Sequence, residues 1–356
     1  MIKKKTKALC VPLNQAEPVR RELRQRQLLR DDVTMIKENT CIYFPLIKVP
    51  ENLTNYRVVT KAFEVRQKKP HSYKELLNLP EKYVDELPTS YDIVGSVILI
   101  KLPKTLSKYE KIIGKALLET HKNIQTVCLI DPVSGELRTR TITIIAGKNQ
   151  TLTTHTEYGL SFDVDVAMTY FSPRLASERK RIATYVKPGE TVVDMFTGVA
   201  PFSIMIARFS KPKKIYAIDK NKKAILLARQ NIKKNHVLDT VEVIQADATD
   251  VIKFIPEKAD RIIMNLPFSA YRFFSAALSI AASLCKIHYY DILQEKEIQE
   301  KISFLKKIAA GQKYILTDIS VHKIKSYAPR EFYIGLDITE FYIGLDITAT
   351  KHADVA

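Results

Sequence analysis

The sequence has no uninterrupted apolar stretch near the roughly 20 residues that a membrane-spanning helix needs, although 46% of its residues are hydrophobic. Its basic N-terminus is not followed by an apolar signal core and a small-residue cleavage site. The four cysteines, Cys10, Cys41, Cys128 and Cys285, lie far apart, without the paired spacing of a zinc site or the density of a disulfide scaffold. We therefore expect a cytoplasmic protein with reduced thiols, no bound metal and no membrane association.

Acidic residues are too few to balance the basic ones, because 39 Asp and Glu stand against 56 Lys and Arg, which gives a net charge of +17. A field of that sign concentrates polyanions and makes their binding sensitive to salt. Nucleic acid is therefore the favoured partner. The alternative is a surface rich in Lys and Glu without a nucleic-acid partner, as in heat-adapted proteins.

With 356 residues, the chain is too long for one ordinary domain. Residues 1–70 contain a basic helical stretch (18–30) and a strand-like stretch (40–49), which indicates a small basic α+β module. Residues 71–165 contain more short strands than helices and are predicted to form an α+β middle domain. Over 166–348 strands and helices alternate strictly, which predicts an α/β domain with a doubly wound parallel sheet.

A nine-residue sequence, EFYIGLDIT, stands at 331–339 and again at 340–348. Neither Gly nor Pro lies at the junction, so the two copies lack the turn that would make them two equivalent strands. We expect the first copy to be the last strand and the second to be a duplicated tail without a chemical role.

The loop after the first strand of the predicted sheet lacks the G-x-G-x-x-G pattern of a pyrophosphate site. Instead, Asp194 ends this strand and Gly198 follows in the turn, while Asp219 and Asp247 follow the second and third strands. A carboxylate at the second strand tip suits a ribose diol, and one after the third strand suits an adenine amino group. The set favours S-adenosylmethionine, although an Asp at a strand end is also a common helix cap.

Six stretches of the chain together resemble the archaeal and eukaryotic tRNA guanine-37 N1-methyltransferases. They are DIVGSV (92–97), GELRTRTITIIAG (135–147), YFSPRLASERKRI (170–182), DMFTGVAPFSI (194–204), MNLPFSA (264–270) and IHYYDI (287–292). The resemblance implies that the last domain is a Rossmann-like class I methyltransferase domain, in which Phe196 and Asn265 also lie beside the cofactor. It implies a tRNA substrate whose anticodon loop is methylated and whose elbow meets the N-terminal module, and we expect a monomer. Ala200 departs from the second glycine usual in the cofactor loop.

Guanine N1 carries a hydrogen, so its methylation requires a general base. Ser172 and Pro173 are predicted to start a helix that carries Glu178. The resemblance implies that Glu178 is this base. The alternative is an ion pair between Glu178 and Arg174 or Arg181, which lie four residues before it and three after it.

Loss of the N1 proton places negative charge on O6, which a fixed cation must stabilise. Arg138 and Arg140 each offer a fork of donors, and the position that matches the family is Arg138. The two arginines lie on one face of a predicted strand, and the alternative is that this face is solvated or binds phosphate.

The sequence Asn265-Leu266-Pro267-Phe268 is one residue away from the Asn-Pro-Pro-aromatic box of exocyclic-amine methyltransferases. Beside a base and an arginine it fits a ring nitrogen better: Asn265 would hold the guanine edge, Pro267 would shape the turn and Phe268 would pack on a ligand. Tyr170 is a candidate for stacking on the flipped base. Alternatively, the box is only a strand-ending turn and Tyr170 only a hydrophobic staple.

These residues predict a tRNA (guanine-37-N1)-methyltransferase. Two enzyme alternatives stay open: a bifunctional wyosine-pathway enzyme that also methylates C7 of the tricyclic intermediate, and an RNA methyltransferase that acts on an exocyclic amine. An RNA-binding protein without cofactor is a third, which the acidic set at the strand ends disfavours.

Overall fold

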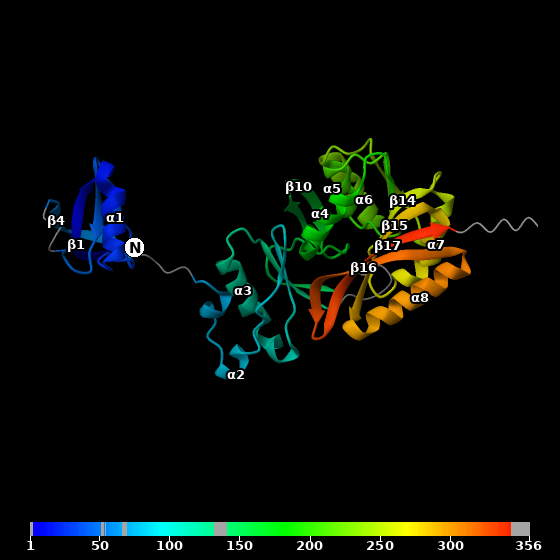
Figure 1. Cartoon of the computed structure of the whole chain (residues 1–356). Coiled ribbons are helices and arrows are strands. Elements are labelled where there is room, and N and C mark those ends of the chain that lie inside the picture. The colour runs from blue at the N-terminus through cyan, green and yellow to red at the C-terminus, as the bar shows by residue number, and fades with distance from the viewer. Residues whose placement is uncertain (1–2, 51–52, 54, 66–69, 132–140, 343–356) are drawn as a thin grey trace, which may run out of the picture. The chain divides into compact units, whose positions relative to one another are not determined.

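The computed structural model describes residues 3–50, 53, 55–65, 70–131 and 141–342, which fall into two compact units, Met1–Leu76 and Leu77–Ala356 (Figure 1). The division into three domains, with boundaries after residues 70 and 165, stays a prediction.

The first unit is a four-stranded antiparallel sheet with one helix, α1 (Ala16–Gln25). Its strands, in the spatial order β2-β3-β1-β4, are β1 (Lys3–Pro12), β2 (Ile36–Glu38), β3 (Cys41–Pro45) and β4 (Arg57–Glu64). Val19 and Leu23 of α1 are buried in one core with Leu9 and Phe44 of the sheet. The predicted α+β module is therefore present, with three strands, β1, β2 and β4, that the sequence pattern did not reveal.

The second unit begins with a small mixed sheet of order β5-β6-β7-β8, on which α3 (Glu110–Thr120) packs against β7 and β8. The other elements of this part are α2 (Glu81–Val84), β5 (Asp92–Val94), β6 (Val97–Ile100), β7 (Thr126–Ile130), β8 (Ile142–Gly147) and the hairpin of β9 (Leu152–Glu157) and β10 (Leu160–Asp165). Strands outnumber helices here, as predicted.

The rest of the second unit is built on a seven-stranded sheet of order β13-β12-β11-β14-β15-β17-β16. Its strands are β11 (Thr191–Asp194), β12 (Lys214–Asp219), β13 (Val241–Gln245), β14 (Ala259–Met264), β15 (Ala281–Gln294), β16 (Tyr314–Ala328) and β17 (Glu331–Tyr342). Its helices are α4 (Ala176–Tyr185), α5 (Pro201–Phe209), α6 (Lys222–Lys234), α7 (Phe274–Ile280) and α8 (Ile298–Gly311). The first five strands in this order are parallel, whereas β17 runs antiparallel to both of its neighbours.

The two faces of this sheet carry separate apolar cores. One core joins the sheet to α4, α5 and α6, and the other joins it to α7 and α8 (Figure 1). Helices on both faces of a mostly parallel sheet make the doubly wound fold that the alternation of strands and helices predicts. In such a sheet a ligand binds outside the carboxyl ends of the strands where the strand order reverses, which is here between β11 and β14.

As predicted, the first copy of the repeated sequence lies in the last strand, but the strand does not end at the junction of the two copies. β17 (Glu331–Tyr342) contains the whole first copy and the start of the second, without a turn at the junction. The remainder of the second copy lies outside the described residues.

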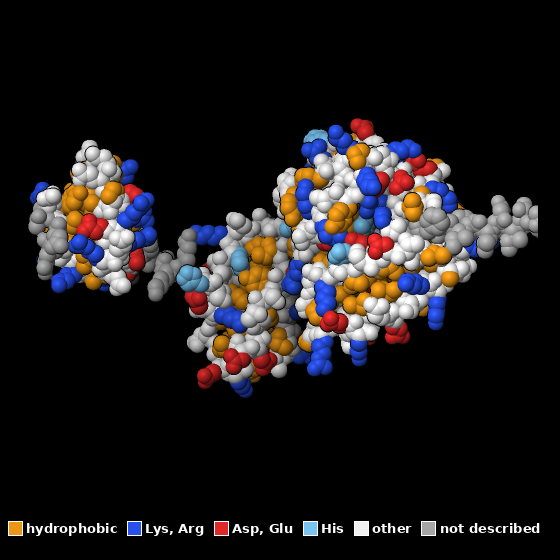
Figure 2. Space-filling view, viewed as in Figure 1, with side chains coloured by type: hydrophobic (Ala, Val, Ile, Leu, Met, Phe, Trp, Pro, Cys, Tyr) orange, Lys and Arg blue, Asp and Glu red, His pale blue; other side chains and the backbone are white. Residues whose placement is uncertain are grey.

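Across the described part of the chain, no helix combines the length and apolar character required to cross a membrane. Figure 2 shows Lys and Arg side chains on the visible face of each unit, in keeping with the excess of basic residues.

Candidate functional site

A cavity of about 500 Å³ opens at the carboxyl ends of β11, β12 and β14. Doubly wound folds bind their ligands at this position. Seven of the residues with a candidate role in the sequence line it: Tyr170, Phe196, Gly198, Asp219, Asn265, Pro267 and Phe268. The fold thus brings these residues to one cavity, and their individual roles stay predictions.

One wall of the cavity is the loop between β11 and α5. Gly198 has a φ of +56°, and its N–H donates to Asp219 Oδ2 at 2.8 Å. The second oxygen of Asp219 accepts the N–H of Asn221 at 2.8 Å, so this carboxylate ties the loop to the end of β12. Burial raises the pKa of Asp219, while the backbone N–H groups oppose the shift. Ala200 has a left-handed φ of +66° before α5, a conformation that glycine adopts with less strain.

Asp194 is the last residue of β11, directly before this loop, and is only 1% exposed. Its Oδ2 accepts hydrogen bonds from Thr197 and Ser203 at 2.8 Å each, whereas its Oδ1 is buried without a partner among the described residues. Burial raises the pKa of Asp194 to about 6, and the charge of Asp219 adds to the shift. Asp194 is not among the described residues that line the cavity.

Asp247 is placed differently, because it caps the 3₁₀ helix Ala248–Lys253. It accepts the N–H of Thr249 at 2.9 Å and forms an ion pair with Lys220 at 3.4 Å. The hydrogen bond from the Thr249 N–H lowers the pKa of Asp247. The helix-cap alternative is thus present for Asp247, which is not among the described residues that line the cavity.

The opposite wall is the Asn265-Leu266-Pro267-Phe268 loop after β14. Phe268, which has a φ of +68°, donates its N–H to Asp291 Oδ1 at 2.7 Å, and this hydrogen bond holds the loop. Lys301 pairs with the other oxygen of Asp291 at 3.0 Å. Asn265 Oδ1 accepts a hydrogen bond from the hydroxyl of Tyr333, so the side-chain amide of Asn265 has a fixed orientation.

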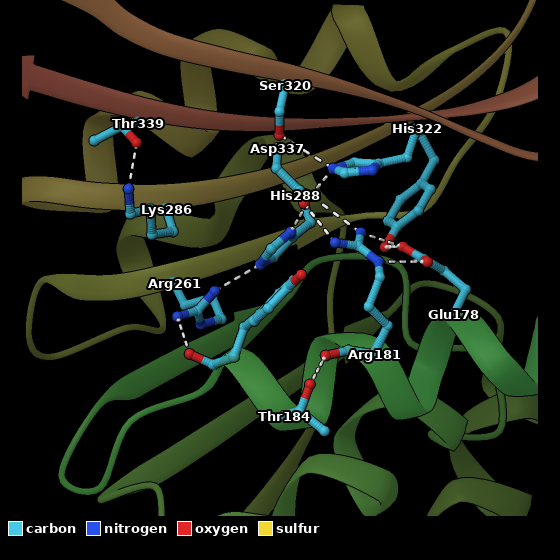
Figure 3. Close-up of polar contacts among 12 residues, drawn as sticks. Glu178, Arg181, Thr184, Arg261, Lys286, His288, Ser320, His322, Asp337 and Thr339 are labelled. Carbon is cyan, nitrogen blue, oxygen red and sulfur yellow. Dashed lines mark hydrogen bonds and ion pairs between the residues drawn. The ribbon is translucent and has the colours of Figure 1, made fainter.

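Glu178 lies in the first turn of α4, after a 3₁₀ turn over Pro173–Leu175, and is 5% exposed. Arg181 donates to both of its oxygens, at 2.8 and 2.6 Å (Figure 3). Tyr290 donates to Oε1 at 2.8 Å. Both oxygens therefore act as acceptors, as in an ionised carboxylate. Of the two ion pairs considered from the sequence, the one with Arg181 forms, while Arg174 pairs with Asp92. Glu178 is not among the described residues that line the cavity.

Arg181 also pairs with Asp337 at 2.6 Å, which continues the polar network away from Glu178 (Figure 3). His288 Nε2 lies 2.7 Å from Arg261, which can only donate, so Nε2 accepts and Nδ1 carries the proton given to Asp337 at 2.6 Å. Burial lowers the pKa of His288, in agreement with a neutral ring. Burial alone would raise the pKa of Asp337, but the contacts with His288 and Arg181 hold it well below its usual range.

A second cavity of about 300 Å³ adjoins the first, and Tyr170, Ser172 and Tyr327 line both. Lys101, Arg174 and Lys325 bring three cationic side chains to its lining. Arg138 and Arg140, the two candidates for stabilising O6, lie outside the described residues.

Several side chains at the site were not assigned a role from the sequence. Arg179 lines the first cavity and forms a buried pair with Glu157. Tyr290, Tyr333 and Asp291 contact Glu178, Asn265 and the loop after β14, as described above. The IHYYDI stretch was a visible signal for two of them, but their partners depend on strand register, which the sequence does not show.

Models of known protein families match three parts of the chain. The TRM5/TYW2 methyltransferase domain matches residues 153–317, the TYW2 N-terminal domain 73–151 and the tRNA methyltransferase 5 N-terminal domain 8–54. Over 334 residues the chain is 37% identical to the tRNA (guanine(37)-N(1))-methyltransferase Trm5b of Pyrococcus abyssi, covering 93% of this chain and 98% of that protein. The chain belongs to the TRM5/TYW2 methyltransferase family.

Other members of the TRM5/TYW2 family show its breadth. A tRNA(Phe) (4-demethylwyosine(37)-C(7)) aminocarboxypropyltransferase of Methanocaldococcus jannaschii is 35% identical over 248 residues, covering 69% of this chain and 96% of that protein. The solved complex of aTrm5 and tRNALeu superposes with a TM-score of 0.78 at 33% identity, covering 93% and 99% of the two chains. The M. jannaschii TYW2 structure in complex with AdoMet has a TM-score of 0.55 at 31% identity, covering 71% and 100%. These structures confirm the predicted Rossmann-like methyltransferase fold.

Proposed function

We propose that this chain is a tRNA (guanine-37-N1)-methyltransferase that uses S-adenosylmethionine. The observation that carries the proposal is the similarity to Trm5b, which extends over nearly the whole length of both chains. The cavity at the strand ends supports the cofactor part of the proposal.

The residues of the first cavity fit S-adenosylmethionine, which supplies an electrophilic methyl group when bound. Asp219 is an acceptor at the tip of β12 suited to a ribose diol, and Gly198 leaves the loop wall open. The oxygen of Asp194 without a partner favours a nearby cation. Phe196 offers an apolar wall, packed on Phe273 with ring centroids 5.0 Å apart.

In the proposed reaction Glu178 takes the proton from guanine N1, and Arg138 stabilises the charge that develops on O6. Asn265 and Pro267 hold the edge of the guanine, and Tyr170 stacks on it at the boundary between the two cavities. Arg181 and Tyr290 hold the Glu178 carboxylate, so in the proposed reaction the guanine approaches it at the start of α4 while these contacts are kept. Arg181 keeps Asp337 as a partner when Glu178 is engaged elsewhere.

Asp247 is proposed to accept from the adenine amino group, although in this structure it caps a helix turn. The N-terminal module (1–70) is proposed to bind the tRNA elbow, the anticodon loop enters the cavities, and the protein acts as a monomer. The excess of basic residues supports association with the phosphate backbone.

The two enzyme alternatives have less support. The wyosine-branch relative matches less of the chain than the N1-methyltransferase does. None of the relatives described above is named for methylation of an exocyclic amine.

Methylation of transcripts with and without a guanosine at position 37, followed by identification of the methylated nucleoside, tests the proposal. N1-methylguanosine that depends on guanosine 37 is the expected product. Methylation of an amino group, or equal methylation of both transcripts, would refute it.

A further inference from the structure

One face of the strand pair β15–β17 carries an unusual set of polar side chains. The antiparallel register pairs His288 with Asp337, Tyr290 with Gly335, and Ile292 with Tyr333. Side chains alternate along a strand, so these three pairs share one face. The contact of Asp337 with Arg181 places this face toward α4 (Figure 3), and the contact of Tyr290 with Glu178 agrees with this.

Tyr290 is fixed on this face by packing and is 1% exposed. Its ring lies over Gly335, because a Cβ added to Gly335 would lie 3.3 Å from Tyr290 Cε1. The centroids of the Tyr290 and Phe202 rings are 5.8 Å apart. From this position its hydroxyl donates to Glu178 Oε1 at 2.8 Å. Burial raises the pKa of Tyr290 far above its usual range, so the phenol remains a donor.

Tyr333 is also 1% exposed, and its ring centroid lies 6.1 Å from that of Tyr290. Its hydroxyl donates to Asn265 Oδ1. In this hydrogen bond Asn265 Oδ1 is the acceptor, which leaves the Nδ2 group to donate to another partner. Two neighbouring phenols on one sheet face thus hold two side chains that come from α4 and from the loop after β14.

We propose that Tyr290 and Tyr333 are positioning residues for methyl transfer, which orient Glu178 and Asn265 respectively from one face of β15–β17. The inference rests on the proposed function, because Glu178 and Asn265 are the groups assigned to the guanine there. Neither tyrosine needs to touch the substrate. Each removes rotamer freedom from a reacting group, and misplacement by about 1 Å can lower a rate by about 100-fold.

Tyr290→Phe and Tyr333→Phe test the proposal, because each removes one hydroxyl and keeps the ring. Single-turnover rates with a guanosine-37 transcript are expected to fall by roughly 10-fold or more, with nearly unchanged affinities for tRNA and S-adenosylmethionine and a nearly unchanged melting temperature. Tyr216→Phe is the matched control, since Tyr216 is a buried tyrosine of the same sheet that lies in β12.

A double-mutant cycle separates positioning from a structural role. If Tyr290 acts through Glu178, Tyr290→Phe should have little further effect on the rate in a Glu178→Gln background. The same holds for Tyr333→Phe in an Asn265→Ala background. Additive losses in both cycles would show that the tyrosines act elsewhere and would overturn the proposal.

Gly335→Ala provides a second route that leaves both hydroxyls in place. The new Cβ would meet Tyr290 and Ile324 at 3.3 Å and should displace the Tyr290 ring, lowering the rate without loss of tRNA affinity. If wild-type protein methylates guanosine 37 while the Phe variants keep its rate, only the positioning role is wrong. If wild-type protein methylates no guanosine-37 transcript, the proposed function is wrong and the positioning role falls with it.

Discussion

Asp194→Asn should stabilise the protein at pH 8, although it removes a charge that the proposed cofactor site uses. Asp194 is buried below the loop between β11 and α5, and one of its oxygens has no partner among the described residues. Burial raises its pKa from 3.8 to about 6. Ionisation of Asp194 therefore costs less free energy in the unfolded chain than in the folded protein.

The sign of the effect follows from proton binding. Between pH about 4 and about 6 the folded protein binds more protons at Asp194 than the unfolded chain, so stability is lost as the pH rises through this range and stays lower above it. The shift from 3.8 to about 6 corresponds to about 3 kcal/mol at roughly 1.36 kcal/mol per pKa unit. The new amide nitrogen lacks an acceptor, which costs about 1–2 kcal/mol. A net gain of about 1–2 kcal/mol, or about 3–6 °C in melting temperature, remains at pH 8.

Thermal melts of the full-length variant and wild type from pH 4 to pH 8 would measure this gain. The difference between the two proteins should favour Asp194→Asn at pH 8 and vanish or reverse at pH 4. Asp247→Asn is the control, because the Thr249 N–H lowers the pKa of Asp247 and the variant should not gain stability at high pH. A difference between Asp194→Asn and wild type that does not change with pH would refute the reasoning. Calorimetry should also show weaker binding of S-adenosylmethionine to Asp194→Asn.

Three further changes address the proposed chemistry and domain roles. Glu178→Gln should lower the single-turnover rate by roughly 10²–10⁴ with cofactor and tRNA affinities nearly kept; a near-normal rate in a folded variant would leave the ion pair with Arg181 as its only role. Asp219→Ala should weaken S-adenosylmethionine binding by roughly 1–3 kcal/mol in calorimetry, and unchanged affinity in a folded variant would remove Asp219 from the site. Deletion of residues 1–70 should weaken tRNA binding and flatten its salt dependence while cofactor binding is kept; loss of cofactor binding would show that the boundary is misplaced.

The parallel part of the sheet could be predicted from the sequence because its strands and helices are marked by local sequence patterns. Helix α5 begins at Pro201 and ends at Phe209, since proline suits the first helical position and the apolar run continues to that end. The same locality places Asp219 and Asn265 at strand ends, and therefore in one cavity. By contrast, β1 (Lys3–Pro12) was missed, because its first half is exposed on both faces and shows no alternation of apolar and polar residues.

The partners of Glu178 could not be predicted, because they are set by tertiary contacts. Local spacing offered both Arg174 and Arg181, and nothing in the sequence decides between them. In the structure Asp92, distant in sequence, engages Arg174, whereas Asp337 draws Arg181 into the network beside Glu178. Only the fold brings these carboxylates near α4.

The direction of β17 explains how Tyr333 reaches the loop after β14. In a parallel sheet only the carboxyl ends of the strands, and the loops after them, face the ligand. Because β17 runs antiparallel to β15, its first residues lie beside the last residues of β15, and Tyr333 reaches Asn265 from the start of a strand. The reversed strand thus adds to the site a second set of side chains that lie within a rigid strand pair. A loop can place a group near the guanine, but a side chain packed on a sheet face can hold it in one orientation, which is what proton removal from a ring nitrogen requires.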